Sequence, residues 1–382
     1  MSDAYAIASK RLTVTLALGV VVVGAGIVVD PGAAWSGVLV AALWGVAVSV
    51  GAGIFMGVHA VSSARRWLAL HEVTSTLSST LLAPLVALAL LFALGLGHVY
   101  PWAGHEGTAH LAHSKQIWLD RTFFLLRAGI IALAWLGVLA NLRRALAQFV
   151  ARPTREGRIA LARAGALFCV VLGPTISMAF FDWGMTIEPE WSSTIYGFYG
   201  FGASFQAGIA AIAVFGLATK SAAMADADIR HRVGLFLFGF STFWAYLWIS
   251  QFLLIWYVNL PEEVPHYLAR MSGDWAILFA LNLVLNFVVP FVVLLMAKAK
   301  KHPAILFQVA GVVLIGRWLD FYLLVAPADG PLTSAPWAAF GALVAVVSGM
   351  GLLALRALSR TAATTTETSA PAREAVAGHS AE

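Results

Sequence analysis

The sequence predicts an all-α integral membrane protein with ten transmembrane helices, and three observations support this fold class. Hydrophobic residues make up 60% of the 382 residues and charged residues only 11%, whereas a soluble domain carries roughly 25% charged residues. The mean hydropathy of the chain is +0.84. The apolar residues are gathered in runs of about 20, the length that an α-helix needs to cross the hydrocarbon core of a bilayer.

Ten apolar runs follow one another along the chain, separated by short polar segments. The first run follows Lys10 and Arg11 like the apolar region of a signal peptide, but it is long for one and no A-x-A cleavage site follows, so we interpret it as a span. After the last run, residues 359–382 are rich in Thr, Ser and Ala, which predicts a disordered cytoplasmic tail. The predicted spans are residues 12–29, 35–61, 77–99, 119–142, 160–181, 193–217, 233–258, 275–298, 304–326 and 335–356.

The basic residues predict the orientation of the chain. Apart from Lys115, Arg121, Arg127, Arg270 and Arg317, the 24 lysine and arginine residues all fall in the terminal segments and in the even-to-odd connections between spans. Because cytoplasmic loops carry the excess of Lys and Arg, both termini are predicted to be cytoplasmic. Most of the acidic residues fall on the opposite, outer side. The net charge of +5 therefore reflects membrane topology, and we expect no nucleic-acid partner.

Motifs that the chain lacks exclude several classes of function. There is no G-x-x-x-x-G-K-[ST] loop, H-E-x-x-H helix or G-x-S-x-G elbow, so neither nucleotide hydrolysis nor a soluble hydrolase site is predicted. The one cysteine, Cys169, lies in an apolar run, which excludes a disulfide framework, C-x-x-C-H haem attachment and a cysteine-ligated cluster or zinc site. Paired histidines deep in facing spans, which would hold a b-type haem, are also missing. We expect no metal site and no covalently bound cofactor in this chain.

An acidic turn connects the fifth and sixth spans. Its carboxylates belong to Asp182, Glu188 and Glu190. In the sixth span small residues recur four apart, on one helical face, where the backbone of a neighbouring helix can approach closely. These small residues are Gly200, Ser204 and Gly208. We expect Glu188 and Glu190, with Glu262 and Glu263 of a later outer connection, to dock a partner or to release protons.

Charged residues inside membrane spans are costly and usually functional, and the fourth span begins with several of them. Asp120 and Arg127 are seven residues apart, so they share a helical face and lie two turns, or about 10 Å, from each other. Phe123 and Phe124 lie between them. One interpretation is a polar pocket that opens to the outer surface with Arg127 at its floor. The alternative is that Arg127 pairs with an acidic residue of a neighbouring helix and fixes the two helices together.

A second set of charges, Arg317 and Asp320, lies in the ninth span. Their i, i+3 spacing allows them to pair within one helix. Arg317 is some ten residues, or about 15 Å, from the outer end near Pro327, which places it close to the midplane of the membrane. The pair is equally well interpreted as a structural ion pair or as a relay point for protons.

Histidines gather in the outer connection between the third and fourth spans. They are His98, His105, His110 and His113, with Glu106 nearby. No helical i, i+4 pair is present and the connection is rich in Gly, so a hydrated loop or a partner contact is favoured over a metal site. His98 differs, because it lies where the third span meets the membrane interface. A histidine there can accept a quinol proton near neutral pH.

A ladder of polar residues begins at the predicted cytoplasmic end of the second and third spans. His59 lies about 9 Å inside Arg65 in the second span. The third span begins with His71 and Glu72, followed by the hydroxyl residues Thr74, Ser75, Thr76, Ser78, Ser79 and Thr80. Such a series can hold water for proton movement, with His59, His71, Glu72 and Thr76 as the candidates. It is also an ordinary way to hydrogen-bond helices together.

Four long segments together are similar to one family. They are FDWGMTIEPEWSSTIYGFYGFGAS, ISQFLLIWYVNLPEE, GRWLDFYLLVAP and HLAHSKQIWLDRTFFLLR. In these segments the chain resembles the ActF subunits of alternative complex III, which belong to the NrfD-like family of polytopic membrane subunits. The resemblance extends over most of the chain, from the second span to the tenth.

The resemblance implies two four-helix bundles with the first and last spans outside them. The implied parts are 1–34 (first peripheral span), 35–181 and 182–326 (the bundles), 327–358 (last peripheral span) and 359–382 (tail). It also implies a bacterial cytoplasmic (inner) membrane location and a quinol:electron-acceptor (cytochrome c) oxidoreductase complex. Haems and iron–sulfur clusters would lie on partners: an ActC-like membrane paralogue, an iron–sulfur subunit and a multihaem cytochrome. In the NrfD-like family the quinol pocket lies toward the outer face of the first bundle, and by position the candidates are His98, Asp120, Arg127 and Asp182.

Three functions are compared on this basis. The first is a membrane subunit without redox cofactors that supports proton transfer in a quinol-oxidising complex, with quinol binding left open. The second is a structural anchor of the same complex. The third, least favoured, is a stand-alone secondary transporter, because such folds usually show inverted repeats and the two halves of this chain do not match.

Overall fold

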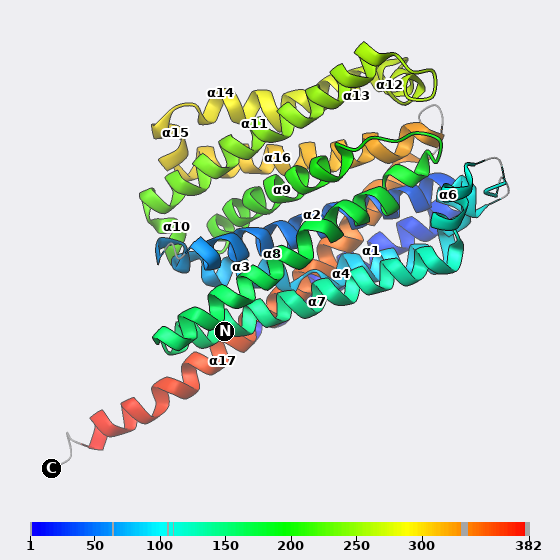
Figure 1. Ribbon diagram of the computed structural model, residues 1–382. Helices are drawn as coiled ribbons and strands as arrows, with labels where there is room; N and C mark the ends of the chain where they lie inside the picture. The colour runs from blue at the N-terminus through cyan, green and yellow to red at the C-terminus, as the bar shows by residue number, and fades with distance from the viewer. Residues whose placement is uncertain (1, 63–64, 105–106, 110, 330–334, 379–382) are drawn as a thin grey trace.

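The structure, a computed structural model, describes the backbone of residues 2–62, 65–104, 107–109, 111–329 and 335–378, with side chains between residues 5 and 360 except at 65, 328 and 329. The described residues form helices and no strands (Figure 1). Ten of these helical segments are long and apolar enough to cross a membrane, and they coincide with the ten predicted apolar runs. The predicted fold class is confirmed.

Eight spans are each built on one continuous helix. These are α1 (Ser2–Val29), α2 (Pro31–Ser62), α7 (Arg121–Ala151), α8 (Arg155–Trp183), α9 (Tyr196–Ala218), α11 (Ala227–Val258), α16 (Pro303–Val325) and α17 (Pro336–Gly378). The backbone of α17 continues beyond residue 359, from which the composition predicts a disordered tail, and that disorder stays a prediction. Several helices extend beyond the predicted spans, because polar residues at their ends continue the helix past the apolar run.

The third and eighth spans are segmented. The third contains η1 (Arg65–Leu70), α3 (His71–Ser79), α4 (Leu82–Leu90), η2 (Leu91–Gly95) and α5 (Leu96–Val99), and the eighth contains α13 (Trp275–Leu283), η5 (Val284–Val288) and α14 (Val289–Leu294). Both η2 and η5 are π-helical, and such segments occur mostly as single-turn bulges at functional sites. Proline lies near each of them, at Pro84 and Pro290, where the missing N–H interrupts the regular hydrogen bonds.

Short helices mark the two ends of the molecule. At the predicted outer end are η3 (Pro101–Ala103), α6 (His113–Trp118), η4 (Met185–Ile187), α12 (Val264–Met271) and η6 (Ala326–Asp329), and at the predicted cytoplasmic end are α10 (Ala222–Ala225) and α15 (Ala297–Lys301). Figure 1 shows α6 and α12 at one end of the long helices and α10 and α15 at the other. The alternation of the chain between these ends agrees with the predicted connections.

The second span, α2, is the central helix. Of its most apolar window 94% is buried, against 11% for the corresponding window of α1. It packs along α8, α9 and α17, and also against α3 and α16. One hydrophobic core therefore extends through the helices before and after the acidic turn. The peripheral α1 packs mainly on α17. The predicted domain boundaries at 35, 182 and 327 remain predictions, since both sets of helices share this core.

Two glycines allow the close packing of α2 on α9. A Cβ atom added to Gly51 of α2 would lie 2.0 Å from the carbonyl oxygen of Ser204, and one added to Gly208 would lie 2.2 Å from the carbonyl carbon of Gly51. A Cβ atom added to Gly200 would lie 2.2 Å from the ring of Phe180, so Gly200 faces a side chain of α8. Ser204 and Gly208 thus lie where the backbone of a neighbouring helix comes close, as predicted, whereas Gly200 makes room for an aromatic ring.

Candidate functional site

The centre of the candidate site is the ion pair between Arg317 and Asp320 on α16. Arg317 is fully buried and Asp320 is 1% exposed, and Nη1 of Arg317 donates to Oδ2 of Asp320 over 2.6 Å. This is the predicted i, i+3 pair. The guanidinium Cζ also lies 4.6 Å from the ring centre of Trp244 on α11, an arrangement in which the aromatic face attracts the cation.

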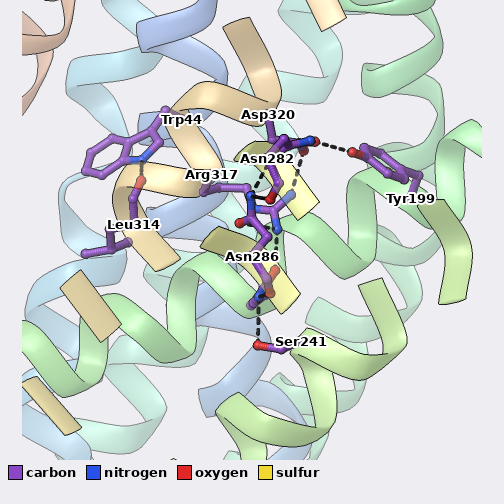
Figure 2. A network of polar contacts seen from close by, with 9 residues as sticks. Trp44, Tyr199, Ser241, Asn282, Asn286, Leu314, Arg317 and Asp320 are labelled. Atoms are coloured by element: carbon purple, nitrogen blue, oxygen red, sulfur yellow. Dashed lines mark hydrogen bonds and ion pairs between the residues drawn. The ribbon is translucent and has the colours of Figure 1, made fainter. Parts of the chain in front are cut away.

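Side chains of other helices add hydrogen bonds to this pair (Figure 2), and Nε of Arg317 has no hydrogen-bond partner among the described residues. The hydroxyl of Tyr199 on α9 donates to Oδ1 of Asp320, and Nδ2 of Asn282 on α13 donates to the same oxygen over 2.8 Å. On the arginine side, Nη2 of Arg317 donates to Oε1 of Gln206 and, over 2.8 Å, to Oδ1 of Asn286. Both charges are therefore solvated by protein groups in place of water.

The network continues toward α11 through Gln206. Its Nε2 donates to the hydroxyl of Ser241 and to the backbone carbonyl of Asn286, both over 2.8 Å. Asn286 also donates to Oδ1 of Asn282 over 2.7 Å. We name Tyr199, Gln206, Ser241, Asn282, Asn286, Arg317 and Asp320 the central network. Every member is buried.

The local backbone explains how two asparagines enter one network. Asn286 lies in the π-helical η5, and its backbone carbonyl accepts from Gln206, since Pro290 four residues later has no N–H to donate to it. The facing helix has Gly316, where a Cβ would lie 2.9 Å from Nδ2 of Asn286. A larger residue at 316 would therefore push η5 away from Arg317.

A second buried ion pair lies nearer the predicted outer end, between Arg127 of α7 and Asp182 of α8. Nε and Nη2 of Arg127 donate to the two carboxylate oxygens over 2.9 and 3.1 Å. Asp182 is fully buried, and its Oδ1 also accepts from Nε1 of Trp118 over 2.8 Å. Rings of Trp118 and Phe123 lie 4.0 and 4.3 Å from the guanidinium carbon. Of the two predicted alternatives for Arg127, the structure contains the pairing with a neighbouring helix.

The other two predicted quinol-site residues do not join this pair. Asp120 is exposed and begins α7, where its carboxylate accepts the backbone N–H of Phe123 over 2.9 Å. This is the ordinary use of aspartate at a helix N-terminus. His98 is exposed in the last turn of α5. Arg127 is turned to Asp182 and Asp120 to its own helix end, and a pocket between them stays a prediction.

A cavity of about 290 Å³ lies beside Trp118, lined also by Lys115, Phe181 and Trp191. None of the four residues predicted for a quinol site lines it. Asp182 is linked to it through hydrogen bonds from two lining residues, from Nε1 of Trp118 to its carboxylate and from the hydroxyl of Thr186 to its backbone carbonyl. The amine of Lys115 is held by the carbonyl of Pro189 over 2.7 Å. No carboxylate of the described residues lines this cavity, and a role in quinol binding stays a prediction.

The acidic turn contains a closed cluster around Glu188. Its carboxylate contacts Nδ1 of His266 at 3.0 Å and accepts from Nη2 of Arg270 over 2.8 Å. His266 stacks on Trp191 with ring centres 3.8 Å apart. Arg270 also donates to the carbonyls of Leu323, Leu324 and His266, tying α12 to the end of α16.

The charges in this cluster shift the pKa values of both titratable partners downward. Burial by itself would raise the pKa of Glu188, but the hydrogen bond from His266 and the positive charge of Arg270 outweigh it and lower the pKa to about 2. Burial and the same arginine lower the pKa of His266 to about 4, although the carboxylate opposes the shift. Near neutral pH the cluster therefore contains a carboxylate, a guanidinium and a neutral imidazole that donates through Nδ1.

The other predicted rim acids differ from Glu188. Glu190 and Glu262 are exposed, and Glu263 is half-buried beside a cavity of about 310 Å³ that Ser193 and Gln251 also line. Glu188 is committed to His266 and Arg270, so only the other three are accessible to a partner. Of the histidine-rich connection, His105, Glu106 and His110 lie outside the described residues, and His113 begins α6. Among the residues that are described, no three His, Cys, Asp or Glu side chains gather as a metal site.

The polar ladder at the predicted cytoplasmic end is formed in part. Nδ1 of His59 and Nδ1 of His71 each bond a backbone carbonyl over 2.7 Å, of Phe55 and Leu68 respectively. Thr76 is buried and Glu72 is exposed. Further along, the hydroxyls of Thr80 and Ser49 are 2.9 Å apart and fully or almost fully buried. The hydroxyls of Thr74, Ser78, Ser79 and Thr80 donate to carbonyls of their own helix turn.

Several site residues were not predicted. Tyr199, Gln206, Asn282 and Asn286 lie in apolar runs, and an amide side chain in such a run is the signal that could have identified three of them. His266 and Arg270 lie in an outer connection, where nothing in the sequence distinguishes a buried pair from a hydrated one. Compared with known proteins, the chain matches no protein-family model and no curated protein.

Proposed function

We propose that this chain is a membrane subunit of a bacterial quinol-oxidising respiratory complex, as its resemblance to ActF-like subunits implies, and that it supports proton transfer. Quinol oxidation releases two electrons and two protons. The electrons would pass to haems and iron–sulfur clusters of partner subunits. The present chain would handle protons only, so its residues need to hold and move protons and not to ligate a redox group.

The observation that carries this proposal is the central network. A buried ion pair costs free energy unless further hydrogen bonds compensate both charges, and in this chain side chains of α9, α13 and η5 supply four such bonds. Such a set of polar side chains in the interior of a membrane protein is typical of ion and proton pathways. Asp320 is the titratable member. Its Oδ1 accepts from Tyr199 and Asn282 and its Oδ2 accepts from Arg317, which leaves one lone pair of Oδ2 to take up a proton.

The central network reaches from the predicted outer end to the middle of the membrane. Tyr199 lies three residues, or about 4.5 Å, inside the start of α9, and Gln206 lies ten residues, or about 15 Å, inside it. Ser241 is 14 residues, or about 21 Å, from the cytoplasmic start of α11. The network therefore supplies the outer half of a path.

The polar ladder supplies the other half. It extends from His71 to the Thr80–Ser49 hydrogen bond, and Ser49 lies about 20 Å from the cytoplasmic end of α2. Gly51, two residues from Ser49 on its cytoplasmic side, packs against the backbone of Ser204, which is itself two residues from Gln206. The Ser204 hydroxyl is buried and has no hydrogen-bond partner in the part of the chain that the structure describes. Transfer between the halves would use a water molecule at this contact, and the Ser204 hydroxyl is placed to bind it.

The second candidate function is a structural anchor of the same complex. It is favoured by the Arg127–Asp182 pair and the Glu188 cluster, in which every carboxylate is bonded to neighbouring helices. The exposed Glu190 and Glu262 would then contact a basic partner surface. For an anchor function, we expect assembly of the complex to depend on these exposed acids. We also expect the number of protons moved per electron pair to be unaffected by substitutions in the central network.

Membership of the complex is tested by isolating the chain with an affinity tag from its native membrane in a mild detergent. We expect a multihaem cytochrome and an iron–sulfur subunit to co-purify, with a haem absorbance spectrum and quinol:acceptor activity. A chain that purifies alone, without haem absorbance, would contradict the proposal, and transport activity of such a monomer would support the transporter hypothesis instead.

A further inference from the structure

The predicted cytoplasmic end contains a cavity of about 790 Å³, the largest volume among the cavities described above. It lies between the end of α2, η1, the start of α3 and the α7–α8 connection, and it is separate from the central network. Ligand sites in proteins have volumes of about 300–1,000 Å³. The proton path as proposed uses His59 and His71 from its wall, but it does not require a cavity of this size.

The wall of the cavity has two chemically different parts. Its cationic part is formed by Arg155 and Arg158 at the start of α8, and its apolar part includes Trp67, Leu68 and Phe149. No lining residue is acidic. Neither arginine has an ion-pair partner among the residues that the structure describes.

The two histidines direct their second ring nitrogen away from the helix backbone. A carbonyl accepts hydrogen bonds and cannot donate, so Nδ1 of His59 and of His71 must each be the donor to Phe55 and Leu68. Nε2 of each ring is left for a ligand. It accepts a hydrogen bond from a hydroxyl when the ring is neutral and donates one to a phosphate oxygen when the ring is protonated.

We propose that this cavity binds the head group of an anionic phospholipid from the cytoplasmic leaflet, with the phosphate at Arg155 and Arg158 and the start of an acyl chain along Trp67, Leu68 and Phe149. Basic pockets between transmembrane helices on the cytoplasmic side are suited to phospholipid head groups. A free phosphate would use only the cationic part. A phospholipid that enters from the membrane interface would also use the apolar part, because its acyl chain would lie against it.

The experiment measures lipid retention by native mass spectrometry after release of the purified protein from nanodiscs of phosphatidylglycerol and phosphatidylethanolamine. The test variant is R155Q/R158Q, and the matched control is R152Q/R163Q, which removes two exposed arginines of the same end that do not line the cavity. We expect the test variant to retain phosphatidylglycerol about tenfold less tightly than the control, because only its arginines lie at the phosphate. Equal loss in both variants would show general surface attraction and would overturn the proposal.

Two further experiments distinguish a lipid phosphate from free phosphate and separate loss of binding from loss of the fold. Wild-type protein is incubated with inorganic phosphate alone, and binding of phosphate with retention of no lipid would overturn the lipid assignment. Ala69→Trp fills the cavity from η1 without changing charge. We expect it to lose the retained lipid while circular dichroism shows an intact fold, and retention at the wild-type level would also overturn the proposal.

Discussion

Two buried arginines, Arg127 and Arg317, are stabilised by the same combination of groups. Each donates to an aspartate, and each lies over an aromatic ring, of Trp118 or Trp244. The carboxylate compensates the charge, and the ring replaces part of the lost hydration without competing for hydrogen bonds. The two sites differ in the number of neighbouring side chains that can relay a proton. The Arg127 pair has few neighbours that can relay a proton, whereas the Arg317 pair is continuous with amide and hydroxyl side chains.

The Glu188 cluster predicts a loss of stability in acid. The pKa of His266 is about 4 in the folded protein, below its ordinary value of 6.5. The unfolded chain therefore binds more protons between these values, and stability falls as the pH is lowered through 6.5. The lowered pKa of Glu188, about 2, acts in the same direction, since its contribution is present above 4.5 and is lost as the pH falls toward 2.

We therefore expect the detergent-solubilised protein to lose about 2 kcal/mol between pH 7.5 and pH 5 through His266 alone. Thermal unfolding followed by tryptophan fluorescence measures this loss. His266→Gln keeps a donor for Glu188 but does not titrate, so its stability should change less over the same interval. Identical pH dependence in the two proteins would show that His266 is not the group responsible.

At the scale of the helices, glycines allow the backbones of α2 and α9 to approach each other closely. Gly208→Ala places a methyl group where only 2.2 Å separates it from the backbone of Gly51. The helices must move apart, and overpacking of this kind typically costs about 1–3 kcal/mol. We expect a lower thermal unfolding temperature for Gly208→Ala.

The matched control for that substitution is Gly239→Ala in α11, where an added Cβ meets nothing within 4 Å. Alanine forms helices better than glycine by up to about 1 kcal/mol, so the control should be as stable as the wild type or more stable. A destabilised control together with an unchanged Gly208→Ala protein would contradict the assigned packing.

The sequence predicts the membrane-spanning helices better than the π-helical turns within them. All ten spans follow from apolar runs, and the contact face of α9 follows from the spacing of Gly200, Ser204 and Gly208. The π-helical segments η2 and η5 were not predicted, because their turns differ from α-helix by one residue and leave no periodic signal. Asn286 owes its position to such a turn, so its partners could not be derived from spacing.

At the scale of the whole molecule, pairing within one helix was predictable and pairing between helices was not. The Arg317–Asp320 pair follows from i, i+3 spacing. The partner of Arg127 is 55 residues away in sequence, and that of Glu188 is 78 residues away. Such contacts depend on which helices become neighbours and on their relative depth, and a single sequence does not contain that information in its local pattern.

The polar ladder and the central network lie on different helices. The polar ladder belongs to α2 and α3, and the central network belongs to α9, α11, α16 and the eighth span. They come together where α2 packs on α9, at Gly51 and Ser204, and α2 also contacts α16 while α3 contacts α9. If protons pass through this chain, the α2–α9 contact is where they change from one set of helices to the other.

The most direct test of this account is the number of protons moved per electron pair by the purified complex in liposomes. Asp320→Asn removes the titratable group of the central network, and Tyr199→Phe removes one of its donors without removing a charge. Trp44→Phe is the matched control, since it removes a hydrogen bond to Leu314 of the same helix and no titratable group. We expect quinol oxidation to continue in all three variants that assemble, with fewer protons per electron pair in Asp320→Asn and Tyr199→Phe and the wild-type ratio in Trp44→Phe. A wild-type proton ratio in both network variants would contradict proton transfer and leave the anchor function.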